Sequence, residues 1–431
     1  MKALVIGSGG REHAILWALR RTSREPLDLY CAPGNGGISE LAECVPVTDN
    51  TALVDFARIN EVDLTIVGPE GPLADGIVDE FESAGLRIMG PNRAAARLEA
   101  SKGFAKDFMT RHGIPTARYQ LATSETEALD ALRSGKFGRS DAAVVIKADG
   151  LAAGKGVVVA ASPVEGEKAV KELLSGNLVS SSATEQLLIE EALKGREVSV
   201  LAFADGKDYV LMPPARDHKR IGERDTGPNT GGMGAITDRS VVDQETLQQI
   251  QREIVEPTLM GASQEGCPFK GILFVGLMLT ADGPKVLEYN VRFGDPETQA
   301  ILVRLQSDLF RIFQAITDGE LRNVQAKWSD QSSACVVLAS GGYPGPCEGG
   351  LPISGLNSAG DDVEIFHAGT SKSEGGGFLT AGGRVLGVAG ADATLAEALS
   401  RCYAAIGRIS WPGMQYRRDI GAFREGAVAG P

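Results

Sequence analysis

The sequence predicts a multidomain protein that combines an α/β unit at its N-terminus with α+β units further along the chain. Residues 1 to about 100 alternate short apolar strands with helical patterns, which is typical of a parallel sheet covered by helices. From residue 196 the dipeptides Asp205-Gly206 and Asp282-Gly283 separate β-rich runs, and this pattern predicts antiparallel hairpins. The Gly-rich region after about residue 330 contains β-rich runs and one helical pattern, so we expect a closing α+β unit.

Each element follows from a local pattern. In the first 100 residues, we expect strands at 4–6, 27–31, 64–67 and 87–89 and helices at 12–21 and 73–84. A helix over 101–112 should end at Gly113-Ile-Pro115. The smaller unit that follows should contain strands at 144–146, 157–160 and 186–189, a helix near 164–174, and a mobile Ser-rich loop at 175–182. Later we expect hairpins at 197–212 and 272–291, strands at 334–339, 364–368 and 384–389, and a helix near 394–406.

Composition and charge narrow the functional class. The 431 residues include 43% hydrophobic and 23% charged residues, as in ordinary globular proteins. The six cysteines show no CxxC or Cys/His cluster, which argues against a zinc site and favours the reducing cytoplasm. No apolar run is long enough for a membrane span, and the chain opens in an apolar strand without a basic leader. The net charge of −13 speaks against a nucleic-acid binder.

The N-terminal turn Gly7-Ser-Gly-Gly-Arg11 invites a dinucleotide-binding interpretation, which requires Gly-x-Gly-x-x-Gly and an acidic residue about 20 positions later. Here Glu12 occupies the third glycine position, and the second strand ends without an acid in Tyr30-Cys31-Ala32. The turn can still hold one phosphate through its amides and Arg11, or it is only a tight strand–helix turn. This segment alone leaves both readings open.

A second Gly-rich segment, residues 144–159, places three glycines and two lysines between β-branched strands. Glycines allow the backbone to approach an anion, and lysine supplies a compact positive charge for phosphate. It is not a Walker loop, because the glycine spacing is wrong and no Ser or Thr follows Lys155. A flexible hairpin with solvated lysines is the alternative, but Lys147 ends a strongly apolar strand, where an unpaired cation is unfavourable.

The strand Val286-Leu-Glu-Tyr-Asn-Val-Arg292 gives the sharpest site. Because side chains alternate along a strand, Glu288, Asn290 and Arg292 should share one face. A carboxylate and an amide oxygen are hard ligands suited to Mg²⁺, and the neighbouring guanidinium can neutralise a phosphoryl group or a substrate carboxylate. A solvated face with a surface salt bridge is an equally simple explanation of this strand alone.

The segment 217–234 is polar and Gly-rich, and we expect a long substrate loop there. The four histidines show no ligand spacing, and no Ser-His-Asp or Cys-His arrangement is evident. Carboxylates close or open the strands at Glu190, Glu191 and Glu197; these are solvated strand ends, or they bind the amino group and ribose of a nucleoside.

Taken together, these motifs resemble the phosphoribosylamine–glycine ligase family of ATP-grasp enzymes. The matching segments run in order along the whole chain: Gly7–His13, Ala32–Asn35, Val67–Glu70, Lys147–Gly156, Asp217–Arg220, Thr226–Gly234, Glu288–Glu297, Gly341–Gly345, His367–Thr370 and Asp419–Gly421. The block 217–234 is specific to this ligase, whereas the lysine and Glu-x-Asn elements occur in ATP-grasp enzymes generally.

The resemblance implies an organisation in four parts: a pre-ATP-grasp parallel-sheet domain at 1–101, an ATP-grasp central body at 102–122 and 191–328, a mobile lid at 123–190, and a C-terminal α+β domain at 329–431.

It also implies a set of site residues. The residues expected to hold ATP are Lys102, Lys147, Lys155 on the lid loop, Glu190, Glu191, Leu193 and Glu197. Those expected to bind the other substrates are Gly9, Gly10, Arg11, Asn35, Glu70, Asp217, Lys219 and Arg292. The expected metal ligands for Mg²⁺ or Mn²⁺ are Glu288 and Asn290, and Arg292 and Lys147 are the expected catalytic residues. The strand 273–278 carries no acid, which puts the ligands of a second metal ion in doubt.

The implied reaction joins glycine to 5-phosphoribosylamine with ATP and yields glycinamide ribonucleotide, ADP and phosphate through glycyl phosphate, a step of purine biosynthesis. We expect a cytoplasmic monomer whose partners are these small molecules, without nucleic acid or membrane. Three alternatives remain at this point: an ATP-grasp ligase or carboxylase with other substrates, a nucleotide-binding regulator without turnover, and an NAD oxidoreductase, which Glu12 weakens.

Overall fold

The structure is a computed structural model that describes residues 1–137, 142–151, 156–175, 186–360 and 362–423. Its first unit is a five-stranded parallel sheet in the order β3-β2-β1-β4-β5. The strands are β1 (Lys2–Gly7), β2 (Asp28–Pro33), β3 (Glu43–Cys44), β4 (Leu64–Val67) and β5 (Ile88–Met89). The helices are α1 (Gly10–Thr22), α2 (Asn50–Ile59), α3 (Glu70–Asp75), α4 (Ile77–Ser83) and α5 (Arg93–Ala100). The parallel sheet predicted from strand–helix alternation is therefore confirmed.

A smaller antiparallel sheet, which we call the lid sheet, follows helix α6 (Lys102–Arg111) in the order β6-β9-β7-β8. Its strands are β6 (Tyr119–Ala122), β7 (Val144–Ala148), β8 (Val157–Ala160) and β9 (Leu187–Glu191). Helices α7 (Glu125–Arg133) and α8 (Pro163–Leu174) pack on it and enclose a core separate from the rest of the molecule. The sheet includes residues 119–122, which we expected in the central body; the domain boundaries stay predictions. Most of the Ser-rich stretch 175–182 lies outside the described residues.

The central sheet is antiparallel in the order β11-β10-β16-β17. Its strands are β10 (Arg196–Asp205), β11 (Tyr209–Leu211), β16 (Lys270–Thr280) and β17 (Gly283–Asn290), so both predicted Asp-Gly hairpins form. Across β16 and β17 the pairing passes from Gly276 opposite Glu288 to Leu277 opposite Val286, which leaves Leu287 as the extra residue of a β-bulge. The remaining helices here are α9 (Gln244–Ile250), a π-helical turn at Gln251–Val255, α10 (Glu256–Gln264), α11 (Glu297–Leu302) and α12 (Leu309–Asp318).

The C-terminal sheet has the order β12-β15-β18-β23-β20 and draws strands from distant parts of the chain. Strands β12 (Arg216–Asp217) and β15 (Gly234–Thr237) come from the central segment, whereas β18 (Ser332–Ala339), β20 (Glu364–His367) and β23 (Arg384–Asp392) come from the C-terminal region, where α13 (Leu395–Ile406) covers the sheet. A small sheet adds β19 (Pro352–Ile353), β21 (Thr370–Lys372) and β22 (Phe378–Thr380).

The expectation of a long loop over 217–234 was wrong. This segment contains β12, the hairpin of β13 (Arg220–Gly222) and β14 (Thr226–Asn229), and the start of β15. Strand β15 pairs with β18, about 100 residues later in the chain. Because that pairing is non-local, the local composition of 217–234 gives no signal of it.

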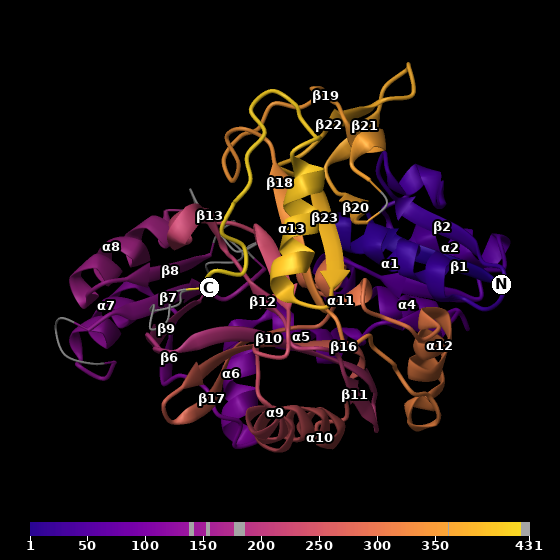
Figure 1. Ribbon diagram of the computed structural model, residues 1–431. Helices are drawn as coiled ribbons and strands as arrows, with labels where there is room; N and C mark the ends of the chain where they lie inside the picture. Colours follow the sequence, from indigo (N-terminus) through magenta and orange to yellow (C-terminus); the bar gives the residue numbers. More distant parts are fainter. Residues whose placement is uncertain (138–141, 152–155, 176–185, 361, 424–431) are drawn as a thin grey trace.

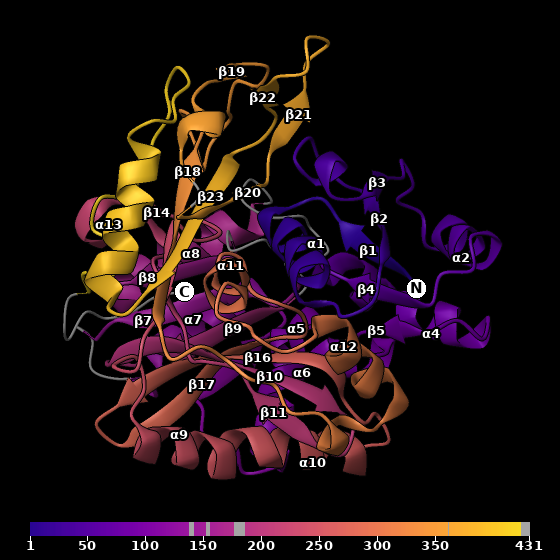
Figure 2. The same ribbon diagram turned by 45° about the vertical axis from the view of Figure 1, so that its right-hand side comes forward.

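Both ribbon views show how these units are arranged (Figure 1, Figure 2). The N-terminal sheet and the lid sheet lie on opposite sides, the central sheet with α9 and α10 lies at one end, and the C-terminal sheet with α13 rises at the other. No helix among the described residues is long and apolar enough to cross a bilayer.

Candidate active site

One cleft of about 400 Å³ collects charged side chains from every unit of the fold. Ligand sites in proteins commonly enclose roughly 300–1,000 Å³, so the cleft is large enough for a small substrate or a nucleotide. Its charged lining residues are Arg11, Glu70, Glu99, Lys102, Lys106, Lys147, Glu190, Asp217, Lys219, Glu288, Arg292, Asp295, Glu297 and Arg384. No serine, cysteine or histidine lines it among the described residues.

Strand β17 presents the predicted row of side chains to this cleft. Glu288, Asn290 and Arg292 line the cleft, and Val291 is buried in the hydrophobic core, as the alternation along the strand predicts. Tyr289 is also part of the core, although it contributes to the cleft lining as well. Neither Glu288 nor Asn290 makes a side-chain hydrogen bond or an ion pair with another described residue.

The ionisation of Glu288 suits a metal ligand. Burial alone raises the pKa of Glu288, but the surrounding lysines Lys219, Lys147 and Lys102 outweigh burial and hold the pKa below its usual value. The carboxylate is therefore ionised at neutral pH. An ionised carboxylate and an amide oxygen two residues apart on one strand fit a divalent cation such as Mg²⁺ that also binds phosphate oxygens.

Arg292 is fixed by two carboxylates from the N-terminal unit. Its guanidinium lies 3.2 Å from Glu70 and 2.8 Å from Glu99, and Glu99 also accepts a hydrogen bond from the backbone amide of Val291 at 2.7 Å. Although burial opposes it, these carboxylates raise the pKa of Arg292 above its ordinary value. The guanidinium therefore stays charged and points in a fixed direction beside Glu288 and Asn290, the two proposed metal ligands, which we call the metal row.

The start of α6 brings Lys102 to the lid turn. Ser101 caps the helix by accepting from the amide of Phe104, and Asp149 accepts from the amide of Gly103 at 2.6 Å. The Lys102 ammonium donates to the carbonyl of Gly150 at 3.0 Å. Burial and the nearby ammonium of Lys147 lower the pKa of Lys102, while Glu288 opposes them.

Lys147 reaches the cleft from β7 of the lid sheet. Its side chain is buried, its ammonium lies 3.3 Å from Glu190 of the neighbouring β9, and it donates to the carbonyl of Leu287 at 3.2 Å. That carbonyl is available because Leu287 is the bulge residue of β17. The bulge therefore connects the lid sheet to the strand that carries the metal row.

Lys219 lies among several acids, one of which is Glu288. It forms an ion pair with Glu197, and the carboxylates of Glu197, Asp217 and Glu288 raise its pKa well above the ordinary value despite burial. Burial raises the pKa of Asp217 to about 6, against the influence of Lys219. The single ammonium of Lys219 thus interacts with the carboxylates of Glu197, Asp217 and Glu288.

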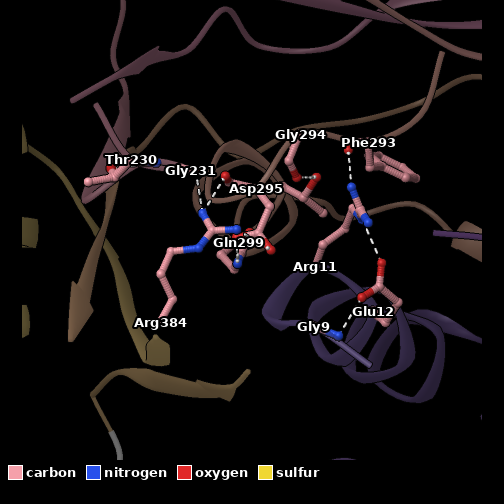
Figure 3. Close-up of polar contacts among 12 residues, drawn as sticks. Gly9, Arg11, Glu12, Thr230, Gly231, Phe293, Gly294, Asp295, Gln299 and Arg384 are labelled. Atoms are coloured by element: carbon pink, nitrogen blue, oxygen red, sulfur yellow. Dashed lines mark hydrogen bonds and ion pairs between the residues drawn. The ribbon is translucent and has the colours of Figure 1, made fainter. Parts of the chain in front are cut away.

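The N-terminal turn is closed by its own glutamate (Figure 3). The Glu12 carboxylate accepts from the amide of Gly9 at 2.5 Å and from Nε of Arg11 at 2.6 Å. A side chain at Gly68 would lie 2.0 Å from Glu12 Oε1, so Glu12 fills the space between the two glycine turns. Arg11 in turn donates to the carbonyl of Phe293 at 3.0 Å. The Gly9 amide, which a dinucleotide phosphate would be expected to use, is thus already bonded to Glu12, and this counts against the dinucleotide interpretation.

The structure brings most of the predicted site residues together and leaves others outside the cleft. Those that line it are Arg11, Glu70, Lys102, Lys147, Glu190, Asp217, Lys219, Glu288, Asn290 and Arg292. Those that do not are Gly9, Gly10, Asn35, Glu191, Leu193 and Glu197. Lys155 lies outside the described residues. Direct contact of any of these residues with a substrate stays a prediction.

The residues outside the cleft have local partners. Asn35 donates to the carbonyls of Ser8 and His367, at 2.8 Å each, and accepts from two backbone amides of its own turn. Glu191 pairs with Arg118 at 2.7 Å, and Leu193 packs in a small cluster with Leu287. These side chains shape the walls around the cleft.

Sequence reasoning missed several charged residues that line the cleft: Glu99, Lys106, Asp295, Glu297 and Arg384. Lys106 follows Lys102 by four positions on one helix, so the shared helical face was a usable signal. No local pattern indicated Arg384, because its partners Asp295 and Gly231 are far away in the sequence. The contacts of Arg384 with these two residues are shown in Figure 3.

Comparisons with known proteins agree with this geometry. Three family models of phosphoribosylglycinamide synthetase match in order: the N domain at residues 1–99, the ATP-grasp (A) domain at 100–298 and the C domain at 333–423. The phosphoribosylamine–glycine ligase of Caldanaerobacter subterraneus subsp. tengcongensis is 45% identical over 98% of this chain and 100% of its own length. That of Vibrio cholerae is 47% identical over 98% of both chains.

A solved structure shows the same architecture. The crystal structure of the Thermotoga maritima phosphoribosylamine–glycine ligase superimposes with a TM-score of 0.84 at 33% identity, covering 97% of this chain and 100% of that one. The sequence and structural matches extend over all units that contribute to the cleft. This chain belongs to the phosphoribosylamine–glycine ligase family, whose members are ATP-dependent ligases that form a carbon–nitrogen bond.

Proposed function

We propose that this chain performs the reaction of its family, the ligation of glycine to 5-phosphoribosylamine with ATP, through a glycyl phosphate intermediate. The observation that carries the proposal is the pair Glu288 and Asn290, two oxygen ligands without a protein partner among the described residues, in a cleft lined by Lys102, Lys147 and Arg292. Such an arrangement neutralises and positions phosphoryl groups, and phosphoryl transfer needs little more from a protein.

The two steps balance without a covalent enzyme intermediate. A carboxylate oxygen of glycine attacks the γ-phosphorus of ATP, and ADP leaves. The amine nitrogen of phosphoribosylamine then attacks the carbonyl carbon of glycyl phosphate, phosphate leaves, and the nitrogen releases one proton. A cleft whose described lining contains no serine, cysteine or histidine is consistent with this route.

Each charged side chain of the cleft would have its own role in binding the substrates. Lys102 and Lys147 would hold the ATP phosphates, and Arg292, fixed by Glu70 and Glu99, would orient the glycine carboxylate or the transferring phosphoryl group. Mg²⁺ or Mn²⁺ held by Glu288 and Asn290 would neutralise charge on neighbouring phosphate oxygens.

We also propose that the protein is a monomer in the cytoplasm whose partners are small molecules. The net charge of −13 and six free thiols support this assignment. Multi-angle light scattering at micromolar concentration tests the monomer; a mass near twice the chain mass of 45.3 kDa would contradict it.

The reaction is tested by ADP release that requires both glycine and phosphoribosylamine, with the product identified by mass. The intermediate is tested with ATP labelled with ¹⁸O in its β,γ-bridge. Glycine alone should cause the label to move into the non-bridging positions of the β-phosphate. When glycyl phosphate forms reversibly, the bridge oxygen stays on the β-phosphate of bound ADP, and rotation of that phosphate exchanges it with the other β oxygens before ATP re-forms. ADP release without glycine would contradict the function, and absence of scrambling in an active enzyme would contradict the intermediate alone.

The metal row is tested by Glu288→Gln, which keeps the shape of the side chain but removes its charge. Turnover should fall by roughly 10²- to 10³-fold because phosphate charge is no longer neutralised, while the thermal unfolding midpoint stays close to that of the wild type. Glu82→Gln, an exposed glutamate on α4, serves as the control and should be fully active. Near wild-type turnover of Glu288→Gln would show that the metal ligands lie elsewhere.

A further inference from the structure

Among the residues that line the cleft, three neighbouring charged side chains are almost completely buried. Glu190 on β9 lies between Lys147 on β7 and Lys106 on α6, and the three side chains are only 1–2% exposed. One carboxylate oxygen lies 3.1 Å from the Lys106 ammonium and the other lies 3.3 Å from the Lys147 ammonium. Lys106 has no role in the reaction described above.

The charges of this cluster do not cancel. A single carboxylate can neutralise only one ammonium, so the two lysines and Glu190 together carry one net positive charge in a poorly solvated site. If Lys106 were neutral, Glu190 and Lys147 would form a closed pair without net charge, and a buried pair of that kind attracts a phosphate weakly.

Lys106 also has partners other than Glu190. Its ammonium donates to Thr116 Oγ1 at 2.7 Å, and Thr116 in turn donates to the carbonyl of Val286 on β17 at 2.7 Å. The same ammonium lies 5.7 Å from the centre of the Tyr119 ring, a cation–π contact. These contacts tie Lys106 to the strand that carries the metal row and hold its charge next to Glu190.

We propose that Lys106 is a positioning residue of the nucleotide site: by pairing with one oxygen of Glu190, it leaves the Lys147 ammonium available to hold the phosphates of ATP. The proposal rests on the proposed function, in which Lys147 binds ATP. Lys106 itself need not touch the nucleotide. Its effect reaches ATP through the charge state of the Glu190–Lys147 pair.

The protonation of Lys106 gives this role a pH dependence. Burial lowers the pKa of Lys106 to about 8, against the opposing carboxylates of Glu190 and Glu191 and together with the nearby ammonium of Lys147. The phenol of Tyr119 also faces it. As the pH rises through about 8, Lys106 loses its proton, Glu190 pairs with Lys147 alone, and ATP should bind more weakly. A phosphate monoester loses its last proton near pH 6, so the nucleotide does not titrate in this range.

The test measures MgATP binding by isothermal titration calorimetry without glycine or phosphoribosylamine, so that no turnover occurs. At pH 7, Lys106→Met should weaken ATP binding by about 10- to 100-fold, the value of a charge-assisted hydrogen bond. Lys171→Met, an exposed lysine on the lid helix α8, is the matched control and should bind ATP as the wild type does. Wild-type affinity in Lys106→Met would overturn the proposal.

A second variant separates positioning from a general loss of structure. In Lys106→Met/Glu190→Gln, removal of the Glu190 charge should free Lys147 again, so binding should recover to within about fivefold of the single variant Glu190→Gln. A double variant that binds no better than Lys106→Met would overturn the proposal, because the effect would not pass through Glu190.

The pH dependence requires no variant and therefore remains informative if Lys106→Met does not fold. The ATP dissociation constant of the wild type should rise between pH 7 and pH 9, and a constant value would contradict the proposal. Failure here is distinguishable from failure of the proposed function. If the wild type releases ADP with both substrates but Lys106→Met binds ATP with wild-type affinity, only the positioning role of Lys106 is contradicted. If the wild type binds no ATP at pH 7, the proposed function is contradicted.

Discussion

Lys219 shows how a single residue sets the charge balance of the cleft. It pairs with Glu197 and also lies close to Asp217 and Glu288, so these carboxylates compete for one ammonium. Asp217 is the acid whose pKa burial raises most clearly, to about 6 from 3.8. A carboxyl group of that kind prefers its protonated form in the folded state. Ionised Asp217 is therefore a local source of instability at neutral pH, as is common at functional sites.

The consequence for stability follows from the sign of this shift. The folded pKa lies above the unfolded one, so the stability that Asp217 contributes is complete below pH 3.8 and is lost as the pH rises through about 6. Asp217→Asn should therefore gain stability relative to the wild type between pH 4.5 and pH 7.5, as measured by urea unfolding.

Asp243→Asn is the control for a carboxylate whose contribution to stability does not depend on pH in this range. Asp243 caps α9, and the amide of Thr246, its first partner, lowers the pKa of Asp243. That variant should be less stable than the wild type by a nearly constant amount between pH 4.5 and pH 7.5, because the contribution of a carboxyl group with a lowered pKa changes only below about pH 3.8. If the difference between Asp217→Asn and the wild type did not change with pH, the buried state assigned to Asp217 would be wrong.

Glu12 stabilises the folded N-terminal turn. It is 2% exposed and satisfies both the amide of Gly9 and the guanidinium of Arg11. Glu12→Ala should lower the free energy of unfolding by about 3–5 kcal/mol, because the buried Arg11 would lose its carboxylate partner and keep only the carbonyl of Phe293. Glu25→Ala, which breaks the exposed ion pair with Arg311, should change it by less than about 1 kcal/mol. Equal effects of the two variants would contradict the role of Glu12.

At the scale of elements, β17 was the part of the site that the sequence predicted best. The two-residue period of a strand is enough to place Glu288, Asn290 and Arg292 on one face. The bulge at Leu287 was not predictable, because it depends on the pairing with β16. The partners of Lys106 were equally hidden. Its neighbour Glu190 lies 84 positions away, and only the packing of α6 against the lid sheet brings the two together.

Strand β16 contributes to the metal row through a residue without a side chain. Gly276 lies opposite Glu288, and a methyl group at this position would lie 3.3 Å from Glu288 Cγ. Gly276→Ala should push the carboxylate aside by a few tenths of an ångström and raise several-fold the Mg²⁺ concentration needed for half-maximal activity. Lys270→Ala, at the far end of the same strand, should leave this concentration unchanged. An unaltered metal requirement in Gly276→Ala would mean that the carboxylate tolerates displacement.

At the scale of the whole molecule, the C-terminal unit holds part of the cleft in place. Gly231 lines the cleft, its amide donates to the Tyr343 hydroxyl at 3.0 Å, and its carbonyl accepts from Arg384. Arg384 also reaches Asp295, 3.3 Å away, next to the metal strand (Figure 3). The order of the three domains was predictable from motifs, whereas this clamp required long-range pairing that no local pattern encodes.

Tyr343→Phe should loosen the clamp without disturbing the core. Loss of one hydrogen bond is worth about 1 kcal/mol, so the Gly231 amide should exchange its hydrogen several-fold faster. Hydrogen–deuterium exchange on a peptide covering 226–234 measures this. Tyr416→Phe is the control, since its hydroxyl makes no hydrogen bond with a described residue. Equal exchange in both variants would show that Tyr343 does not restrain Gly231.

The insertion of β12 and β15 into the C-terminal sheet has a consequence for synthesis on the ribosome. Domains usually fold in order as they leave the exit tunnel. In the complete fold, β15 is fully buried and pairs with β18. During synthesis, the edge of β15 that pairs with β18 therefore stays unpaired until about 100 further residues have emerged. A nascent or truncated chain that ends before β18 would expose this edge to other chains. We therefore expect that a fragment ending before β18 does not form a stable, independent ATP-binding module, and that chaperones bind the incompletely synthesised chain.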